Sequence, residues 1–256
     1  MFSVALIGAD GAGKTTIARE IEKLQPLPIK YIYMGVNPGS SNLILPSTRL
    51  ILAIKRALGM QTDMGGPPDR TRVKARTRSA IKRCISTLKS SLHVVNMMSE
   101  EWYRQCISWY YQKCGYVVLY DRHFLSDYYA SDIAGAASNR SLARRIHGFV
   151  LNRFYPNPDL VIFLDAPASV LFARKGEGTL TLLESRRQEY WQQLERVEHC
   201  VVVDASQPQD EVLREVIELI KARALFRKKV GTFASRQNCF SKEKQEKPSE
   251  DSLNVD

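Results

Sequence analysis

A glycine-rich loop directly after the first apolar segment constrains the fold of this chain more than any other feature. The apolar run at residues 2–8 predicts a buried parallel strand, and residues 14–24 have the spacing of an amphipathic helix. Between them, residues 8–16 read GADGAGKTT and satisfy the pattern GxxxxGK[ST]. A loop of this pattern between a strand and a helix predicts a cradle for the phosphates of a nucleoside triphosphate.

The residue types in this loop have separate chemical roles. Glycines let successive backbone N–H groups point at phosphate oxygens, Lys14 brings charge to the terminal phosphates, and the Thr15 hydroxyl suits Mg²⁺. Asp10 either stabilises the turn through the backbone or faces the hydroxyl or amine of an acceptor. We therefore expect ATP and Mg²⁺ as cofactors. The predicted nucleotide-binding residues of the loop are Gly8, Asp10, Gly11, Ala12, Gly13, Lys14, Thr15 and Thr16.

Apolar runs and helical segments alternate along the rest of the chain. The predicted strands are 2–8, 29–34, 116–120, 159–165 and 200–204. The predicted helices after residue 24 are 43–58, 70–114 in at least two pieces, 140–153, 180–198 and 208–225. This alternation predicts an α/β fold, a three-layer sandwich with a five-stranded parallel sheet at its centre.

Charge and cysteine content narrow the partners and the compartment. A formal net charge of +10 favours anionic partners, including phosphorylated small molecules and, by peripheral contact, an anionic membrane. The five cysteines show no CxxC spacing, which favours free thiols in a reducing compartment. The chain shows no basic leader and no apolar run of about 18 residues, so we expect a cytoplasmic protein. No helix-turn-helix, zinc or RNA-recognition signature is present, which disfavours nucleic acid as a partner.

Three motifs together resemble the thymidylate-kinase-like superfamily. They are DGAGKTT at residues 10–16, YDRHFLSDYYA at 120–130 and PNPDLVIFLDAPASVLFARKGE at 156–177. Each lies on the element where that superfamily has it, and the order along the chain is the same. The resemblance implies the P-loop kinase architecture, phosphoryl transfer from ATP with Mg²⁺ and, as one arrangement, a homodimer.

The resemblance also implies a domain organisation. One kinase-like domain would span residues 1–226, with a helical acceptor-region insertion at about 36–114 and a short lid at about 174–187. From Arg227 the apolar periodicity is lost, and the sequence predicts a disordered charged tail over 227–256.

The matched motifs assign roles by phosphoryl-transfer chemistry, which depends on positioning and on cationic stabilisation. Arg122 would grip an acceptor phosphate, and Asp121 would contact Mg²⁺ together with Thr15. Asp165 would either hold the phosphate loop or cap the following helix. The expected catalytic residues are Lys14, Asp121, Arg122 and Arg174. The lid residues expected to close over the donor phosphates are Arg174, Lys175, Arg186 and Arg187. Of these, Arg186 is also expected to bind the nucleotide cofactor.

Two acceptor-reading features of thymidylate kinases are missing. The arginine expected after the second strand is absent, because residues 34–38 read MGVNP. On the helix that reads the pyrimidine, Glu101 falls at the arginine position and Met97 at the stacking phenylalanine position. A carboxylate cannot donate the hydrogen bonds that a guanidinium gives to a pyrimidine carbonyl. The differences argue against an ordinary dTMP kinase.

The segment 69–89 adds eight basic residues against one acid. It is either a solvated surface or a source of arginines that replace the missing phosphate ligand. Three functions therefore stay open. The chain transfers a γ-phosphate to a nucleoside monophosphate or related phosphorylated acceptor, or it acts on a sugar or a glycolipid or polysaccharide acceptor in surface-polysaccharide synthesis, or it is a nucleotide-binding regulatory protein without transfer activity.

Overall fold

The computed structural model describes residues 1–35, 41, 43–57, 80–128, 142–176, 178–195 and 197–245. The predicted sheet is confirmed: five strands pair in the order β2-β3-β1-β4-β5, and every pair is parallel. Each strand lies within two residues of its predicted bounds. The strands are β1 (Ser3–Ile7), β2 (Ile29–Tyr33), β3 (Val117–Asp121), β4 (Leu160–Asp165) and β5 (Cys200–Asp204).

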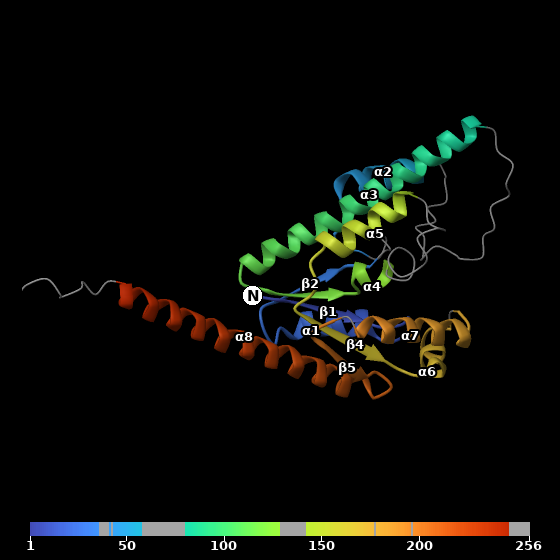
Figure 1. Ribbon diagram of the computed structural model, residues 1–256. Helices are drawn as coiled ribbons and strands as arrows, with labels where there is room; N and C mark the ends of the chain where they lie inside the picture. Colours follow the sequence, from blue (N-terminus) through green and yellow to red (C-terminus); the bar gives the residue numbers. More distant parts are fainter. Residues whose placement is uncertain are drawn as a thin grey trace, which may run out of the picture.

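Helices cover both faces of this sheet, which gives the expected three layers (Figure 1). On one face lie α1 and α8, and on the other α2, α3, α4 and α5; α6 and α7 follow β4. The helices are α1 (Lys14–Leu24), α2 (Pro46–Ala57), α3 (Ala80–Lys113), α4 (Phe124–Tyr128), α5 (Leu142–Phe154), α6 (Ala168–Lys175), α7 (Leu180–Leu194) and α8 (Gln209–Gln245).

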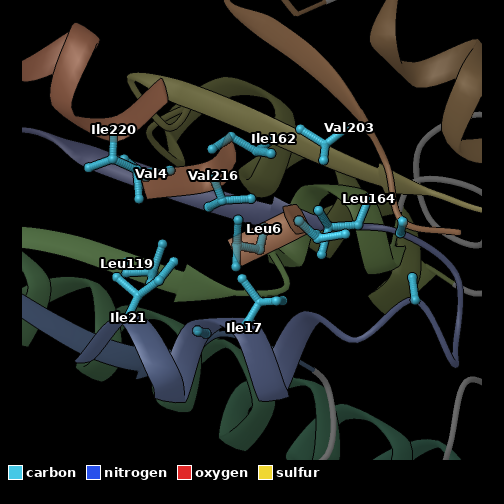
Figure 2. Close-up of a cluster of buried hydrophobic side chains, with 14 of the residues drawn as sticks. Val4, Leu6, Ile17, Ile21, Leu119, Ile162, Leu164, Val203, Val216 and Ile220 are labelled. Atoms are coloured by element: carbon cyan, nitrogen blue, oxygen red, sulfur yellow. The ribbon is translucent and has the colours of Figure 1, made fainter. Parts of the chain in front are cut away.

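The period-two alternation of the strands divides the core between these two helical layers. Leu6 of β1 packs with Ile17 of α1 and Val216 of α8, as Figure 2 shows, whereas its neighbour Ala5 belongs to the cluster on the opposite face. Because both faces are covered, both sets of strand side chains are apolar, which explains why the strands appear as continuous apolar runs.

Two boundaries differ from the sequence-based expectation. The segment predicted as at least two helical pieces contains one uninterrupted helix, α3, because residues 80–113 include neither glycine nor proline to break it. The tail expected to be disordered over 227–256 begins as helix, because α8 continues to Gln245; residues 246–256 lie outside the described residues. Within α8, Arg227 forms hydrogen bonds to Asp159 and to the Met1 carbonyl, and no proline occurs between the start of α8 and Pro248.

The carboxyl ends of the strands meet along one edge of the sheet. The glycine-rich loop follows the central strand β1, Arg122 follows β3 and Asp165 ends β4. β1 lies between β3 and β4, and the connections from the strands run in opposite directions on the two sides of β1. Open parallel sheets bind their ligands at such a switch point, outside the carboxyl ends of the strands.

Two expectations from composition are also tested by the structure. The three cysteines whose side chains are described, Cys106, Cys114 and Cys200, are free. Over the described ranges, we find no helix with the length and apolar character needed to cross a membrane.

Candidate active site

The loop between β1 and α1 adopts the backbone that its glycines permit. Gly8, Gly11 and Gly13 all have positive φ angles, of 148°, 92° and 85°. Gly13 is the N-cap of α1, and neither a capping side chain nor an acidic residue occupies the first turn of that helix. The first N–H groups of α1 therefore keep their hydrogen-bonding capacity for an anion, assisted by the positive end of the helix dipole.

We expect Gly11→Ala to destabilise the protein more than Gly13→Ala does. Both positions require a left-handed backbone, which costs a non-glycine residue about 1–2 kcal/mol. A Cβ at Gly11 would also lie 2.6 Å from the Leu171 carbonyl oxygen of α6, whereas a Cβ at Gly13 meets no atom within 4 Å. Chemical denaturation of the two variants measures the difference; equal losses of unfolding free energy would contradict the close packing of α6 on the loop.

Lys14 lies buried across the loop. Its Nζ donates to the Gly8 carbonyl at 2.8 Å and to the Ala9 carbonyl at 2.7 Å. Burial, reinforced by the positive charge of Arg122, lowers the pKa of Lys14 to about 8. The ammonium is thus held beside the phosphate cradle in surroundings of low dielectric, where its charge acts strongly on a bound anion.

Thr15 and Asp121 are brought together from positions 106 residues apart. The Thr15 hydroxyl donates to Asp121 Oδ2 at 2.6 Å, and the Tyr31 hydroxyl donates to the same oxygen at 3.0 Å. Asp121 Oδ1 is buried, and no described residue donates to it. A buried carboxylate oxygen without a donor, next to a hydroxyl oxygen, fits the oxygen donor set of Mg²⁺. The two predicted metal residues therefore fit the implied metal.

A cluster of charges surrounds Asp10 at the tip of the loop. Its Oδ1 accepts from Arg122 Nη2 at 2.7 Å and its Oδ2 from Arg186 Nη1 at 2.6 Å, while Lys175 Nζ lies 4.0 Å from Oδ1. Burial alone would raise the pKa of Asp10, but the charges of Arg122 and Lys14 outweigh it and hold that pKa well below its usual value. Asp10 thereby links the loop to the end of β3 and to α7.

Arg122 adopts a strained backbone. Its φ of 69° is left-handed, although the residue is not a glycine. Its Nε is buried, and none of the described residues accepts a hydrogen bond from it. Against the effect of burial, the charges of Asp127 and Asp10 raise the pKa of Arg122 above its usual value, so the guanidinium stays charged. Strain of this kind, together with an unused buried donor, is typical of functional positions.

The other two lid arginines do not reach the loop. Arg174, expected as catalytic, donates instead to the Ala205 carbonyl at 2.7 Å, beyond β5. Arg187 makes two parallel hydrogen bonds to Asp165, at 2.7 and 2.8 Å. Asp165 was expected either to hold the phosphate loop or to cap the following helix. The N-cap of α6 is instead Pro167, and the Asp165 carboxylate pairs with Arg187 of α7.

Two further residues of the loop, Ala12 and Thr16, differ in exposure. Ala12 is buried against the core, and Thr16 is exposed on the first turn of α1. His123, next to the Asp121-Arg122 pair, is buried between the rings of Tyr120 and Tyr155. Burial lowers the pKa of His123 to about 3, which keeps it neutral.

Arg104 on α3 was not anticipated from the sequence. It is fully buried, and it donates to the Gly35 carbonyl at 3.0 Å and to the Leu43 carbonyl at 3.2 Å. Glu100, one turn earlier, accepts from the Leu45 N–H at 3.0 Å. Arg104 thereby links Gly35, just after β2, to Leu43, and Glu100 binds the same stretch of chain at Leu45. The only signal for these two residues in the sequence is the mixture of polar and aromatic residues around them, which read EEWYRQ at 100–105.

Glu101 and Met97 have partners within the helical layer. Glu101 lies 3.1 Å from His147 Nε2 of α5, and both side chains are buried. Met97 Sδ accepts from the Tyr128 hydroxyl at 2.8 Å. The basic segment 69–89 lies outside the residues whose side chains the structure describes, as do residues 36–38 of the replaced arginine segment.

The chain was compared with known families, curated proteins and solved structures. No protein-family model matches the chain. A curated relative, the probable thymidylate kinase of Archaeoglobus fulgidus, is 27% identical over 226 residues, which cover 86% of this chain and 94% of the relative. Solved structures of deoxyadenosine kinase from M. mycoides are also similar. The dATP complex shows 17% identity and a TM-score of 0.48, covering 86% of this chain and 100% of that one. The dCTP complex shows 16% identity and a TM-score of 0.42, covering 86% and 99%.

Proposed function

We propose that this chain, which is distantly similar to a probable thymidylate kinase, is an ATP- and Mg²⁺-dependent phosphotransferase. The acceptor we propose first is a nucleoside monophosphate or a related phosphorylated molecule. One observation carries the proposal: Lys14, the Thr15–Asp121 pair and Arg122 converge at a single point of the sheet edge.

On the donor side, the loop would hold the triphosphate. The amides of residues 8–15 and the Lys14 ammonium would contact its oxygens, with Thr15 and Asp121 holding Mg²⁺. The metal ion, when bound, supplies positive charge that offsets the charge of the phosphates. Arg186 is already held over the loop by Asp10, so the proposed lid at 174–187 would contribute its charge with little reorganisation.

On the acceptor side, Arg122 would grip the incoming group. Its Nη2 is occupied by Asp10, but its buried Nε–H keeps a donor for an anion. A phosphate that pairs with the guanidinium would compete with Asp10 for it, and Asp10 would keep Arg186 as a partner. This exchange would couple acceptor binding to the position of α7.

A second candidate, an acceptor that presents a neutral hydroxyl group, is favoured by the carboxylates in the site. Asp10 pairs with Arg122, and in the sequence alignment Glu101 falls at the position of the arginine with which thymidylate kinases read the base. Carboxylates accept hydrogen bonds from hydroxyl groups and disfavour a second anion. Sugars and glycolipid or polysaccharide ends belong to this class.

An ADP-release assay over matched acceptor pairs tests the proposed function. Each nucleoside is compared with its monophosphate, and each sugar with its sugar phosphate, at constant MgATP. Turnover only with phosphorylated members supports the first candidate, and turnover with unphosphorylated members supports the second. Binding of MgATP by calorimetry without turnover of any acceptor would leave the nucleotide-binding regulatory protein as the answer.

A further inference from the structure

Tyr31 on β2 takes part in the candidate metal site, although no loop motif contains it. Its hydroxyl and that of Thr15 both donate to Asp121 Oδ2, at 3.0 and 2.6 Å. One oxygen of the carboxylate therefore has two donors from the protein, and the other, Oδ1, has none among the described residues. The two carboxylate oxygens of Asp121 therefore differ in their partners among the described residues.

This asymmetry costs free energy unless a cation offsets it. Asp121 is 0% exposed, so bulk solvent does not reach this oxygen. Leaving a buried acceptor unsatisfied costs about 1–3 kcal/mol, and more for a charged group. Mg²⁺ takes oxygen ligands, commonly one or two carboxylates, directly or through its own waters. The unpaired oxygen is thus suited to the metal ion.

The fold explains why Tyr31 reaches this carboxylate. Tyr31 is paired with Leu119 and lies two residues before Tyr33, which is opposite Asp121 in the parallel register. Residues two apart on a strand face the same side, so Tyr31 and Asp121 both face the layer of α1. An aromatic side chain is long enough to bridge this diagonal, and the Tyr31 ring is packed within the core cluster.

We propose that Tyr31 is a positioning residue, which holds the Asp121 carboxylate with Oδ1 turned toward the metal ion. The last torsion of an aspartate is broad, so the carboxylate needs a fixed donor to keep one orientation. Thr15 is itself a candidate metal ligand, which leaves Tyr31 as the donor independent of the metal.

This inference rests on the proposed function, and Mn²⁺ binding tests it without an assay of turnover. Mn²⁺ is titrated into the protein–ADP complex and followed by electron paramagnetic resonance. For Tyr31→Phe, which removes only the hydroxyl, the Kd for Mn²⁺ is expected to rise about 10-fold or more, as for other partners of metal ligands. The affinity for ADP in the presence of EDTA is expected to stay unchanged.

Tyr120→Phe is the matched control. Tyr120 is a buried tyrosine of β3 whose hydroxyl bonds to Ser108 at 2.6 Å, so its loss removes a buried hydrogen bond away from Asp121. It should lower thermal stability and leave the Mn²⁺ affinity intact. The inference is overturned if Tyr31→Phe binds Mn²⁺ like the wild type, or if both variants weaken binding equally. Absence of Mn²⁺ binding by the wild-type ADP complex would overturn the proposed function itself.

Discussion

Replacing Lys14 with alanine is expected to reduce ATP-dependent ADP formation by about 10³-fold or more. The ammonium lies buried at the loop carbonyls of Gly8 and Ala9, where no solvent screens it. A charge that is fixed in place stabilises the transferring phosphate without reorganisation, and alanine supplies none. Steady-state ADP release at saturating MgATP measures the loss.

The control for this prediction is Lys23→Ala on the same helix. Lys23 is exposed and, among the described residues, pairs with Glu20 at 2.6 Å, so its removal should leave turnover unchanged. Lys14→Ala also leaves two loop carbonyls without their donor, at a cost of about 1–3 kcal/mol. A thermal melt of each variant therefore accompanies the assay, and activity is read well below the melting temperature. Wild-type turnover in a folded Lys14→Ala protein would refute phosphate binding by this loop.

Arg122→Ala is expected to lower kcat/KM for the acceptor by about 10³-fold. The variant removes the guanidinium whose Nε has no acceptor in the described part of the chain, while Asp10 keeps its 2.6 Å partner Arg186. The α7 contact should therefore survive, and the loss should fall on acceptor capture and transfer. Arg122→Lys should recover only part of the activity, because an ammonium cannot form two parallel hydrogen bonds. Kinetics with varied acceptor at fixed MgATP give both parameters.

Arg187→Ala provides the comparison, because Arg187 is a basic residue of α7 with its hydrogen bonds directed to Asp165. Its kcat/KM should stay within about tenfold of the wild type, as expected for a residue that positions a helix. The acceptor class also affects the outcome. For a phosphorylated acceptor, Arg122→Ala should raise KM strongly, whereas for a neutral hydroxyl the change should lie mainly in kcat. Equal losses in the Arg122 and Arg187 variants would show that the effect is structural.

Features encoded by neighbouring residues could be predicted from the sequence. The loop depends on a few consecutive φ angles, which the glycines supply, and its role follows from the amides it presents. The five strands were predictable because a parallel sheet buried on both faces requires continuous apolar runs. Thr15 and Asp121 were both expected at the metal site, and they lie within hydrogen-bonding distance because α1 begins just after β1 and Asp121 ends the adjacent strand β3.

Contacts between distant side chains could not be predicted in the same way. Arg174 and Arg187 both lie on the expected lid, yet they bond to Ala205 and Asp165 rather than to the loop. Arg104 and Tyr31 lie outside the three motifs of the resemblance, and only the packing of α3 and β2 against β3 gives them their partners. Arg227 of α8 likewise has its partner, the Met1 carbonyl, at the other end of the chain.

The amino-acid sequence by itself determined the phosphate loop, the order of strands and helices along the chain, and the residue types at the end of β3. The tertiary structure alone decided which charges meet: Asp10 with Arg122 and Arg186, and Tyr31 with Asp121. The physical reason is the range of the interactions. Backbone conformation is set by adjacent residues, whereas a side-chain hydrogen bond requires two groups within about 3 Å, which only the packing of distant elements provides.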